Sequence, residues 1–116
     1  MTEAKTFELL YNTWTRSTDK KIIRCIFNEP KEYEIYEVSN EEVDKPFDEG
    51  SFTLQNSNGE MHIIFLSKHF LQPIYTIEDV TETQLVLSSV NEDSRKHAKL
   101  ALDADGNHLI TFKKYD

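Results

Sequence analysis

Short segments of alternating apolar and polar residues, separated by turn-forming dipeptides, recur along most of this chain. The clearest turn is Asn58-Gly59, between SFTLQ and EMHIIFL, because both residues tolerate the positive φ that tight hairpins require. Apolar residues fall on one face of each flanking segment, Phe52 and Leu54 in the first and Met61, Ile63 and Phe65 in the second. This pattern predicts a β-hairpin.

Similar pairs of segments occur elsewhere in the chain. KKIIRCIF and YEIYEV flank NEPKE, and IYTIEDV and LVLSSV flank TETQ. HAKLAL and HLITF flank Asp105-Gly106, so we expect a further pair of strands there. Upstream, TFELLYNTW predicts a short helix that gives way to a strand near Trp14. About eight short strands in meander order predict an all-β fold, an up-and-down antiparallel barrel with a short N-terminal helix, rather than a sandwich.

Length and charge limit the domain organisation and the partners. The chain has 116 residues, which fits one domain over residues 1–116. Its net charge is −8, and Glu29 to Glu49 holds nine acids and two lysines. Because such a surface repels phosphate backbones, we expect no nucleic-acid partner, whereas a basic protein is a possible partner. Ser39 to Glu49 also contains Pro46, which predicts a loop or at best a poor edge strand.

Four parts of the chain together resemble small lipocalin-like barrels of the calycin type. They are Trp14, GSFTL at 50–54, IEDVTETQLVLSS at 77–89 and the terminal LITFKKYD. The resemblance implies that a short helix precedes the first strand and that the tryptophan closes one end of the barrel, where a buried indole covers about 150–250 Å². It also implies a basic residue packed over that tryptophan, for which Lys113 and Lys114 are the nearest candidates.

A barrel of this size has an interior that side chains fill or that holds one small ligand. The residues expected to point inward are Ile23, Cys25, Phe27, Tyr33, Ile35, Phe52, Leu54, Met61, Ile63, Phe65, Tyr75, Ile77, Leu85 and Leu87. The predicted site for a small apolar ligand consists of Tyr33, Ile35, Phe52, Leu54, Ile63, Phe65 and Tyr75. Tyr33 and Tyr75 would add polar groups to apolar walls. Because many of these side chains are bulky, a filled interior is the alternative.

The residue types that carry catalysis or bind metals lack the necessary spacing. We interpret His97 and His108 as exposed strand positions, since no histidines here have the close spacing of zinc ligands. DADGN lacks the later glutamate of a calcium loop, so it predicts a hairpin turn. Cys25 is the only cysteine and has apolar neighbours, which predicts a buried, unreactive thiol. We therefore expect a protein that is not an enzyme and needs no metal or cofactor.

Two predicted strands, IIRCIF and MHIIFL, are apolar on both faces, so their outer faces need a cover. We expect the N-terminal helix around Phe7, Leu9 and Leu10 to provide it, with a dimer interface as the alternative. The chain contains no run of about 20 apolar residues, so we expect no membrane span. The N-terminus lacks the basic and then apolar layout of a signal peptide. We therefore expect a cytoplasmic protein, or a secreted or periplasmic one whose leader was removed.

These features favour a small non-enzymatic barrel that binds a small hydrophobic molecule in its interior. The alternative is a protein-interaction module, of the inhibitor or immunity type, whose acidic face binds a basic partner. The pattern leaves open whether the protein is a monomer or a dimer.

Overall fold

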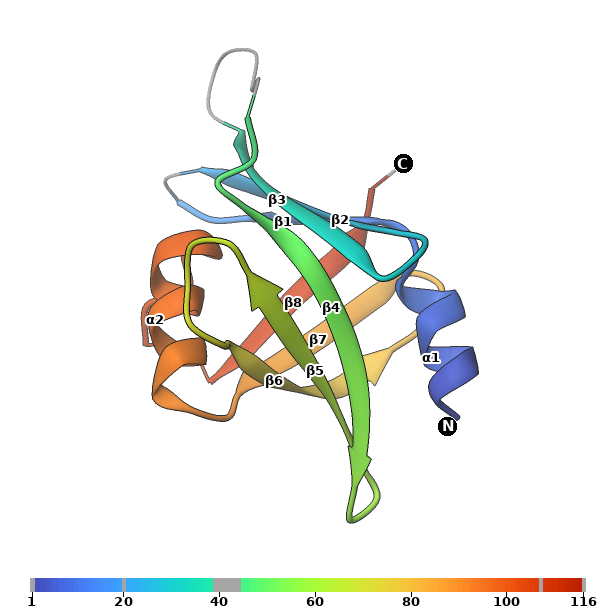
Figure 1. Cartoon of the computed structure of the whole chain (residues 1–116). Coiled ribbons are helices and arrows are strands. Elements are labelled where there is room, and N and C mark those ends of the chain that lie inside the picture. Colours follow the sequence, from blue (N-terminus) through green and yellow to red (C-terminus); the bar gives the residue numbers. More distant parts are fainter. Residues whose placement is uncertain (1, 20, 39–44, 107, 116) are drawn as a thin grey trace.

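The computed structural model describes residues 2–19, 21–38, 45–106 and 108–115, which form a closed antiparallel barrel of eight strands with two short helices (Figure 1). In chain order the elements are α1 (Glu3–Leu10), β1 (Thr13–Ser17), β2 (Ile22–Asn28), β3 (Glu32–Val38), β4 (Asp48–Ser57), β5 (Glu60–Ser67), β6 (Ile74–Val80), β7 (Gln84–Ser89), α2 (Glu92–Ala101) and β8 (Leu109–Lys114). The predicted barrel and its N-terminal helix are confirmed.

Every strand pairs with the next along the chain, and β1 closes the sheet by pairing with β8. The closing register places Trp14 opposite Lys114 and Thr15 opposite Lys113. Because β1 pairs with β8, the sheet closes and neither strand is an exposed edge strand where the two pair.

The predicted hairpins form where their turn residues allow it. At the β4–β5 turn φ is 53° at Asn58 and 82° at Gly59, the left-handed conformation that a tight hairpin requires. The β2–β3 and β6–β7 hairpins, predicted across NEPKE and TETQ, also form. All predicted inward residues are buried in the core except Met61 and Ile77, which are half-buried and pack against it.

Helix α2 departs from the expectation, because the segment HAKLAL is helical rather than a strand. Asn91 and Ser94 form a reciprocal capping box: each side chain accepts a hydrogen bond from the other residue's backbone N–H. Two acids in the first turn also suit the positive end of the helix dipole. The dipeptide Asp105-Gly106 therefore leads from α2 into β8, and the predicted hairpin across it is wrong.

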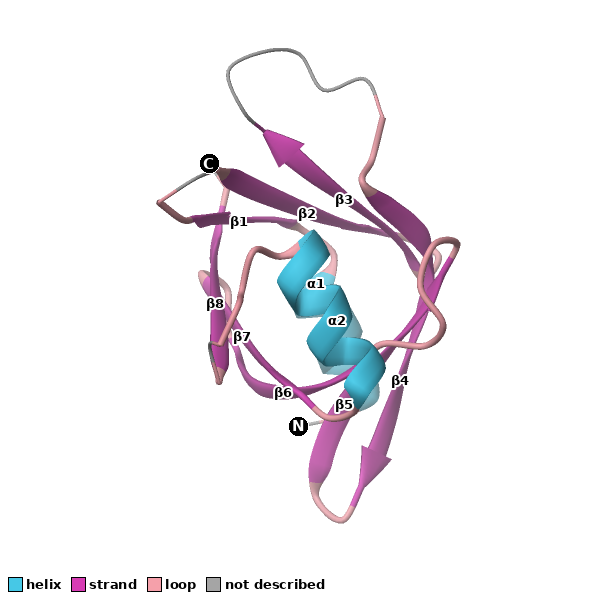
Figure 2. Ribbon diagram, turned by 90° about the vertical axis from the view of Figure 1, so that its left-hand side faces the viewer, coloured by secondary structure: helices cyan, strands magenta, loops and turns pink. Residues whose placement is uncertain are grey.

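The two helices close opposite ends of the barrel (Figure 1). Figure 2 views the molecule from the α2 end, where α2 lies across the opening within the ring of strands. At the other end, Leu10 of α1 is fully buried and Phe7 packs against Phe52 with 5.7 Å between ring centroids. No helix of the described residues is long and apolar enough to cross a membrane.

The predicted role of α1 as a cover for the outer faces is wrong. Ile22 and Leu66, on the outside of the barrel, remain 41% and 47% exposed. Only two residues separate α1 from β1, so the helix cannot move away from the end at which β1 begins.

Trp14 contributes to closing the α1 end of the barrel, as predicted. Its indole is fully buried, and Nε1 donates a hydrogen bond of 3.0 Å to the carbonyl oxygen of Leu10. Within the described part of the chain no cation stacks on this indole, and Lys113 and Lys114 are exposed.

The predicted loop from Ser39 to Glu49 is shorter at its C-terminal end than expected. Asp48 and Glu49 already belong to β4, while residues 39–44 lie outside the described residues.

Candidate functional site beneath helix α2

A column of aromatic rings fills the barrel between the two helices. In order the rings are Phe7, Phe52, Phe27, Phe65 and then Tyr33 and Tyr75, with neighbouring centroids 4.6–6.2 Å apart. The column ends beneath α2, where Phe65 and Tyr75 contact the ring of His97 at 5.5 and 5.7 Å.

All residues of the predicted ligand site are buried in this core, namely Tyr33, Ile35, Phe52, Leu54, Ile63, Phe65 and Tyr75. The fold brings Tyr33, Phe65 and Tyr75 together beneath α2, whereas Phe52 packs against α1. In this conformation their side chains pack against one another, so a bound molecule would have to displace some of them.

The carboxylate of Asp48, which is fully buried, accepts four hydrogen bonds. Its Oδ1 accepts from the Glu49 backbone N–H at 2.9 Å and from the Ser67 hydroxyl at 2.6 Å. Its Oδ2 accepts from the Tyr33 hydroxyl and from His97 Nε2–H, both at 2.8 Å. A buried carboxylate is stable only when its charge is hydrogen-bonded or paired, and Asp48 meets that requirement from four directions.

His97 is also fully buried, and its second nitrogen contacts the hydroxyl of Tyr75. The distance between Tyr75 Oη and His97 Nδ1 is 2.7 Å, and the same hydroxyl lies 3.0 Å from the carbonyl oxygen of Ser94. Because the phenol has one proton, it donates either to the carbonyl or to the imidazole. If it donates to the carbonyl, Nδ1 must be the donor and His97 is a cation; if it donates to Nδ1, His97 is neutral.

Burial and hydrogen bonding act on the pKa values of this cluster in opposite directions. Burial alone would raise the pKa of Asp48, but the hydrogen bonds from His97, Ser67 and Tyr33 and the attraction of His97 outweigh it, so the pKa falls below its ordinary value. Burial, together with the charge of Asp48, raises the pKa of Tyr33. Burial also raises the pKa of Tyr75 well above that of an ordinary tyrosine. Asp48 therefore carries a negative charge, and both phenols, Tyr33 and Tyr75, stay protonated.

The prediction that His97 is an exposed strand position is wrong. On helix α2 it shares a buried face with Ser94, Ala98 and Ala101, at helical spacing. Asp48 lies on the inner face of β4, two and four positions before Gly50 and Phe52. Both patterns are visible in the sequence, although a charged residue near the end of the acidic segment Glu29 to Glu49 gives no reason to place it inside.

Side-chain contacts at both ends of α2 attach the helix to the barrel. At its C-terminal end Arg16 of β1 donates from Nε to the carbonyl oxygen of Leu102 at 3.0 Å. At its N-terminal end Asn91 donates from Nδ2 to the carbonyl oxygen of Gln72 at 3.2 Å. Between these ends, His97 attaches the middle of the helix to Asp48.

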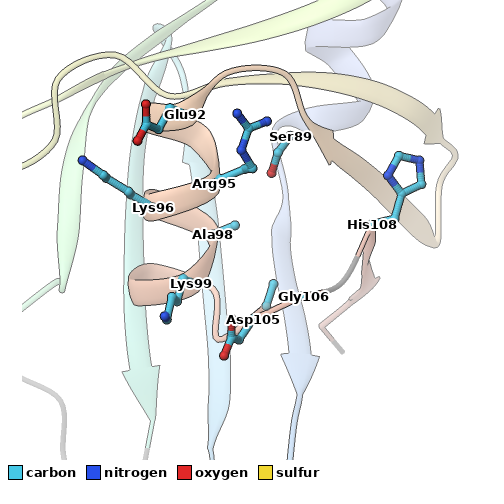
Figure 3. Close-up of a pocket in the computed structure, with 10 residues that line it drawn as sticks. Ser89, Glu92, Arg95, Lys96, Ala98, Lys99, Asp105, Gly106 and His108 are labelled. Carbon is cyan, nitrogen blue, oxygen red and sulfur yellow. The ribbon is translucent and has the colours of Figure 1, made fainter.

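A groove of about 580 Å³ runs along the outside of α2, between the helix and the start of β8 (Figure 3). Its lining includes Arg95, Lys99 and His108, all exposed, and the small buried residues Ala98 and Ala104. None of the residues of the predicted ligand site lines this groove.

The lone cysteine and the metal-binding residue types of the described chain form no further reactive centre. Cys25 is buried, and burial followed by the charge of Asp48 raises the pKa of its thiol, so it is a poor nucleophile. Within residues 2–19, 21–38, 45–106 and 108–115, no three His, Cys, Asp or Glu side chains gather closely enough to hold a metal ion.

Comparisons with protein-family models, curated proteins and solved structures find no match to this chain.

Proposed function

We propose that this protein is a non-enzymatic, lipocalin-like barrel that binds a small, largely apolar molecule in its interior beneath α2. The observation that supports the proposal is the position of the polar cluster. Asp48, Tyr33 and Tyr75 lie at one end of an aromatic column and are covered by a single ten-residue helix. Binding sites for small molecules combine apolar walls with a few placed polar groups in this way.

Binding is favoured over catalysis by the state of the hydroxyl groups. Asp48, His97 and Tyr75 form a carboxylate–imidazole–hydroxyl chain, an order that also occurs in hydrolases. Here, however, all three side chains are fully buried, and burial keeps the phenol of Tyr75 protonated. A protonated phenol without access to solvent or substrate is a poor nucleophile.

Ligand entry requires α2 to move, because the helix covers the opening (Figure 2). The helix is attached mainly through side chains, among them those of Arg16, Tyr75 and His97, whereas the wall strands pair along their backbones. A ligand that binds only the open state would shift the population towards it. The wall of the barrel remains closed during this exchange.

The test is a titration of the whole protein followed by NMR and calorimetry, with fatty acids, retinoids, haem and butylbenzene as probes. Asn91→Ala removes the N-cap of α2 and its contact with Gln72, so we expect a faster association rate. The matched control is Thr2→Ala, which removes the N-cap of α1 at the opposite end, and its association rate should be unchanged. If no probe binds, or if both variants change the rate equally, the proposal fails.

A second candidate function, binding of a basic protein, is favoured by the outer face of β3 and β4. The register places Glu34 directly opposite Glu49, a like-charge pair of which only Glu49 has a cationic partner within the described residues, Lys68 at 3.3 Å. Both line a groove of about 480 Å³ that also contains Glu32 and the half-exposed Leu66. A basic partner with an apolar side chain would pair with Glu34 and cover Leu66.

Surface plasmon resonance with a lysine- and arginine-rich peptide tests this second function. Glu34→Gln should slow association at low salt, whereas Glu3→Gln, on α1 and away from the groove, should not. Equal rates for both variants would exclude a role for the groove.

A further inference from the structure

The imidazole of His97 occupies a receptor built by the barrel. Nε2–H donates to Asp48 at 2.8 Å, and Nδ1 contacts the Tyr75 hydroxyl at 2.7 Å. Phe65 lies at 5.5 Å, tilted by 30°, and Phe70 approaches at 4.9 Å with its ring perpendicular to the imidazole. The barrel thus holds a nitrogen base between a carboxylate and aromatic rings.

If α2 moves away, this receptor loses His97 and keeps its other parts. Asp48 still accepts hydrogen bonds from Tyr33, Ser67 and the Glu49 backbone, and one position on Oδ2 becomes free. Aromatic faces near a carboxylate attract cations, and a buried hydrogen bond to a charged group is stronger than one between neutral groups.

Resting on the proposed function, we infer that the molecule bound beneath α2 carries a nitrogen base protonated at neutral pH, an ammonium or imidazolium group, attached to an apolar body. Such a group would take the place of the His97 ring at Asp48. The apolar body would lie against the aromatic rings of the column, Phe65 first.

Other polar groups fit this receptor less well. A carboxylate would bring a second negative charge beside Asp48 in a buried space, which strongly disfavours ionisation of both. A hydroxyl would donate one hydrogen bond but leave the charge of Asp48 without a counterion. The cations Arg95 and Lys99 have little effect on this preference, because they are exposed along the groove outside α2, where water and salt screen their charges.

Three probes with the same body and different ends test the inference on the whole protein at pH 7: phenylbutylamine, phenylbutanol and phenylbutyrate. We expect the amine to bind about tenfold more tightly than the alcohol, with the acid weakest, from the usual difference between charged and neutral hydrogen bonds. The overall charge of −8 also attracts amines, so the titrations are repeated at about 0.5 M salt, where only a buried contact keeps its preference.

Asp48→Asn should reduce the ratio of amine to alcohol affinity to about one, since it removes the buried charge. The matched control is Glu49→Gln, which removes one charge from the next residue, where the side chain faces outward. If Asp48→Asn does not fold, the affinities of the three probes for the unaltered protein still test the inference. Equal binding of amine and alcohol, or tighter binding of the acid, overturns the inference and leaves the proposed function standing. Failure of these three probes and of all the probes of the proposed function, namely fatty acids, retinoids, haem and butylbenzene, overturns the proposed function itself.

Discussion

Replacing His97 by leucine tests whether the buried pair with Asp48 holds α2 on the barrel. His97→Leu removes one of four donors to a carboxylate that is fully buried and keeps its charge. Removing one partner of a buried pair typically costs about 3–5 kcal/mol, and here the carboxylate of Asp48 loses its imidazole partner and keeps three donors. A domain of this size has a free energy of unfolding of about 5–15 kcal/mol, so the variant should remain folded but weakened.

The assay is urea unfolding followed by circular dichroism, in which we expect the midpoint to fall by about 2–3 M. His97→Gln is the control, because its amide nitrogen can donate to Asp48 from nearly the same place, and it should lose less than half as much. A leucine variant within about 1 kcal/mol of the unaltered protein would refute the reasoning, since the three remaining donors would then stabilise the buried charge without His97.

The loss of stability caused by His97→Leu should depend on pH in a defined direction. The pKa of Asp48 is lowered in the folded protein, so its contribution is present above the unfolded value of about 3.9 and is lost as the pH falls through the folded value. His97→Leu removes the strongest of the hydrogen bonds that lower this pKa. The stability difference between the two proteins should therefore be largest near pH 7 and narrow at about pH 3. A difference that is the same at both pH values would contradict this origin.

Three further predictions follow from the packing. A Cβ on Gly50 would lie 2.1 Å from the carbonyl oxygen of Leu66, so Gly50→Ala should lower the free energy of unfolding, measured in urea, by about 2 kcal/mol or more. At Gly59 an added Cβ would meet no atom within 4 Å, so Gly59→Ala carries only backbone strain and should cost less. Trp14→Phe removes the indole donor to a carbonyl of α1 and should cost about 1–3 kcal/mol by circular dichroism. A thiol-specific chromogenic disulfide reagent should not react with Cys25 until the protein unfolds. Rapid reaction in the native state would contradict the burial of Cys25 and the raised pKa of its thiol.

Local signals explain why most of the barrel is predictable from the sequence. The turn at Asn58-Gly59 and the alternation around it concern neighbouring residues, and adjacent strands joined by short turns have little choice but to pair. Tyr33 and Tyr75 follow the same alternation, which is why their inward position could be predicted.

Helix α2 was not predictable from the same signal, because HAKLAL satisfies two periods at once. Its apolar residues alternate, as in a strand, yet Ala98 and Ala101 also share one helical face. Six residues are too few to separate these periods. The deciding feature is the cap at Asn91 and Ser94, which lies upstream of the alternating segment.

The pairing of Asp48 with His97 has no local signal at all, since 49 positions separate the two residues. Acidic residues are mostly found at protein surfaces and histidines are intermediate, so neither residue considered alone is expected to be fully buried. Only the closed barrel, with α2 across its opening, brings the two side chains together.

The position of α2 in the chain explains how a cover can be mobile without opening the wall. The helix lies in the connection between β7 and β8, whose backbones pair from Gln84 with Lys113 to Ser88 with Leu109. None of these pairs involves α2, so the wall does not need the helix in place. The covalent connections at both of its ends also keep it near the opening when its side-chain contacts break. The proposed binding function requires a cover that leaves the opening and returns to it, and a helix inserted between two paired strands would meet that requirement.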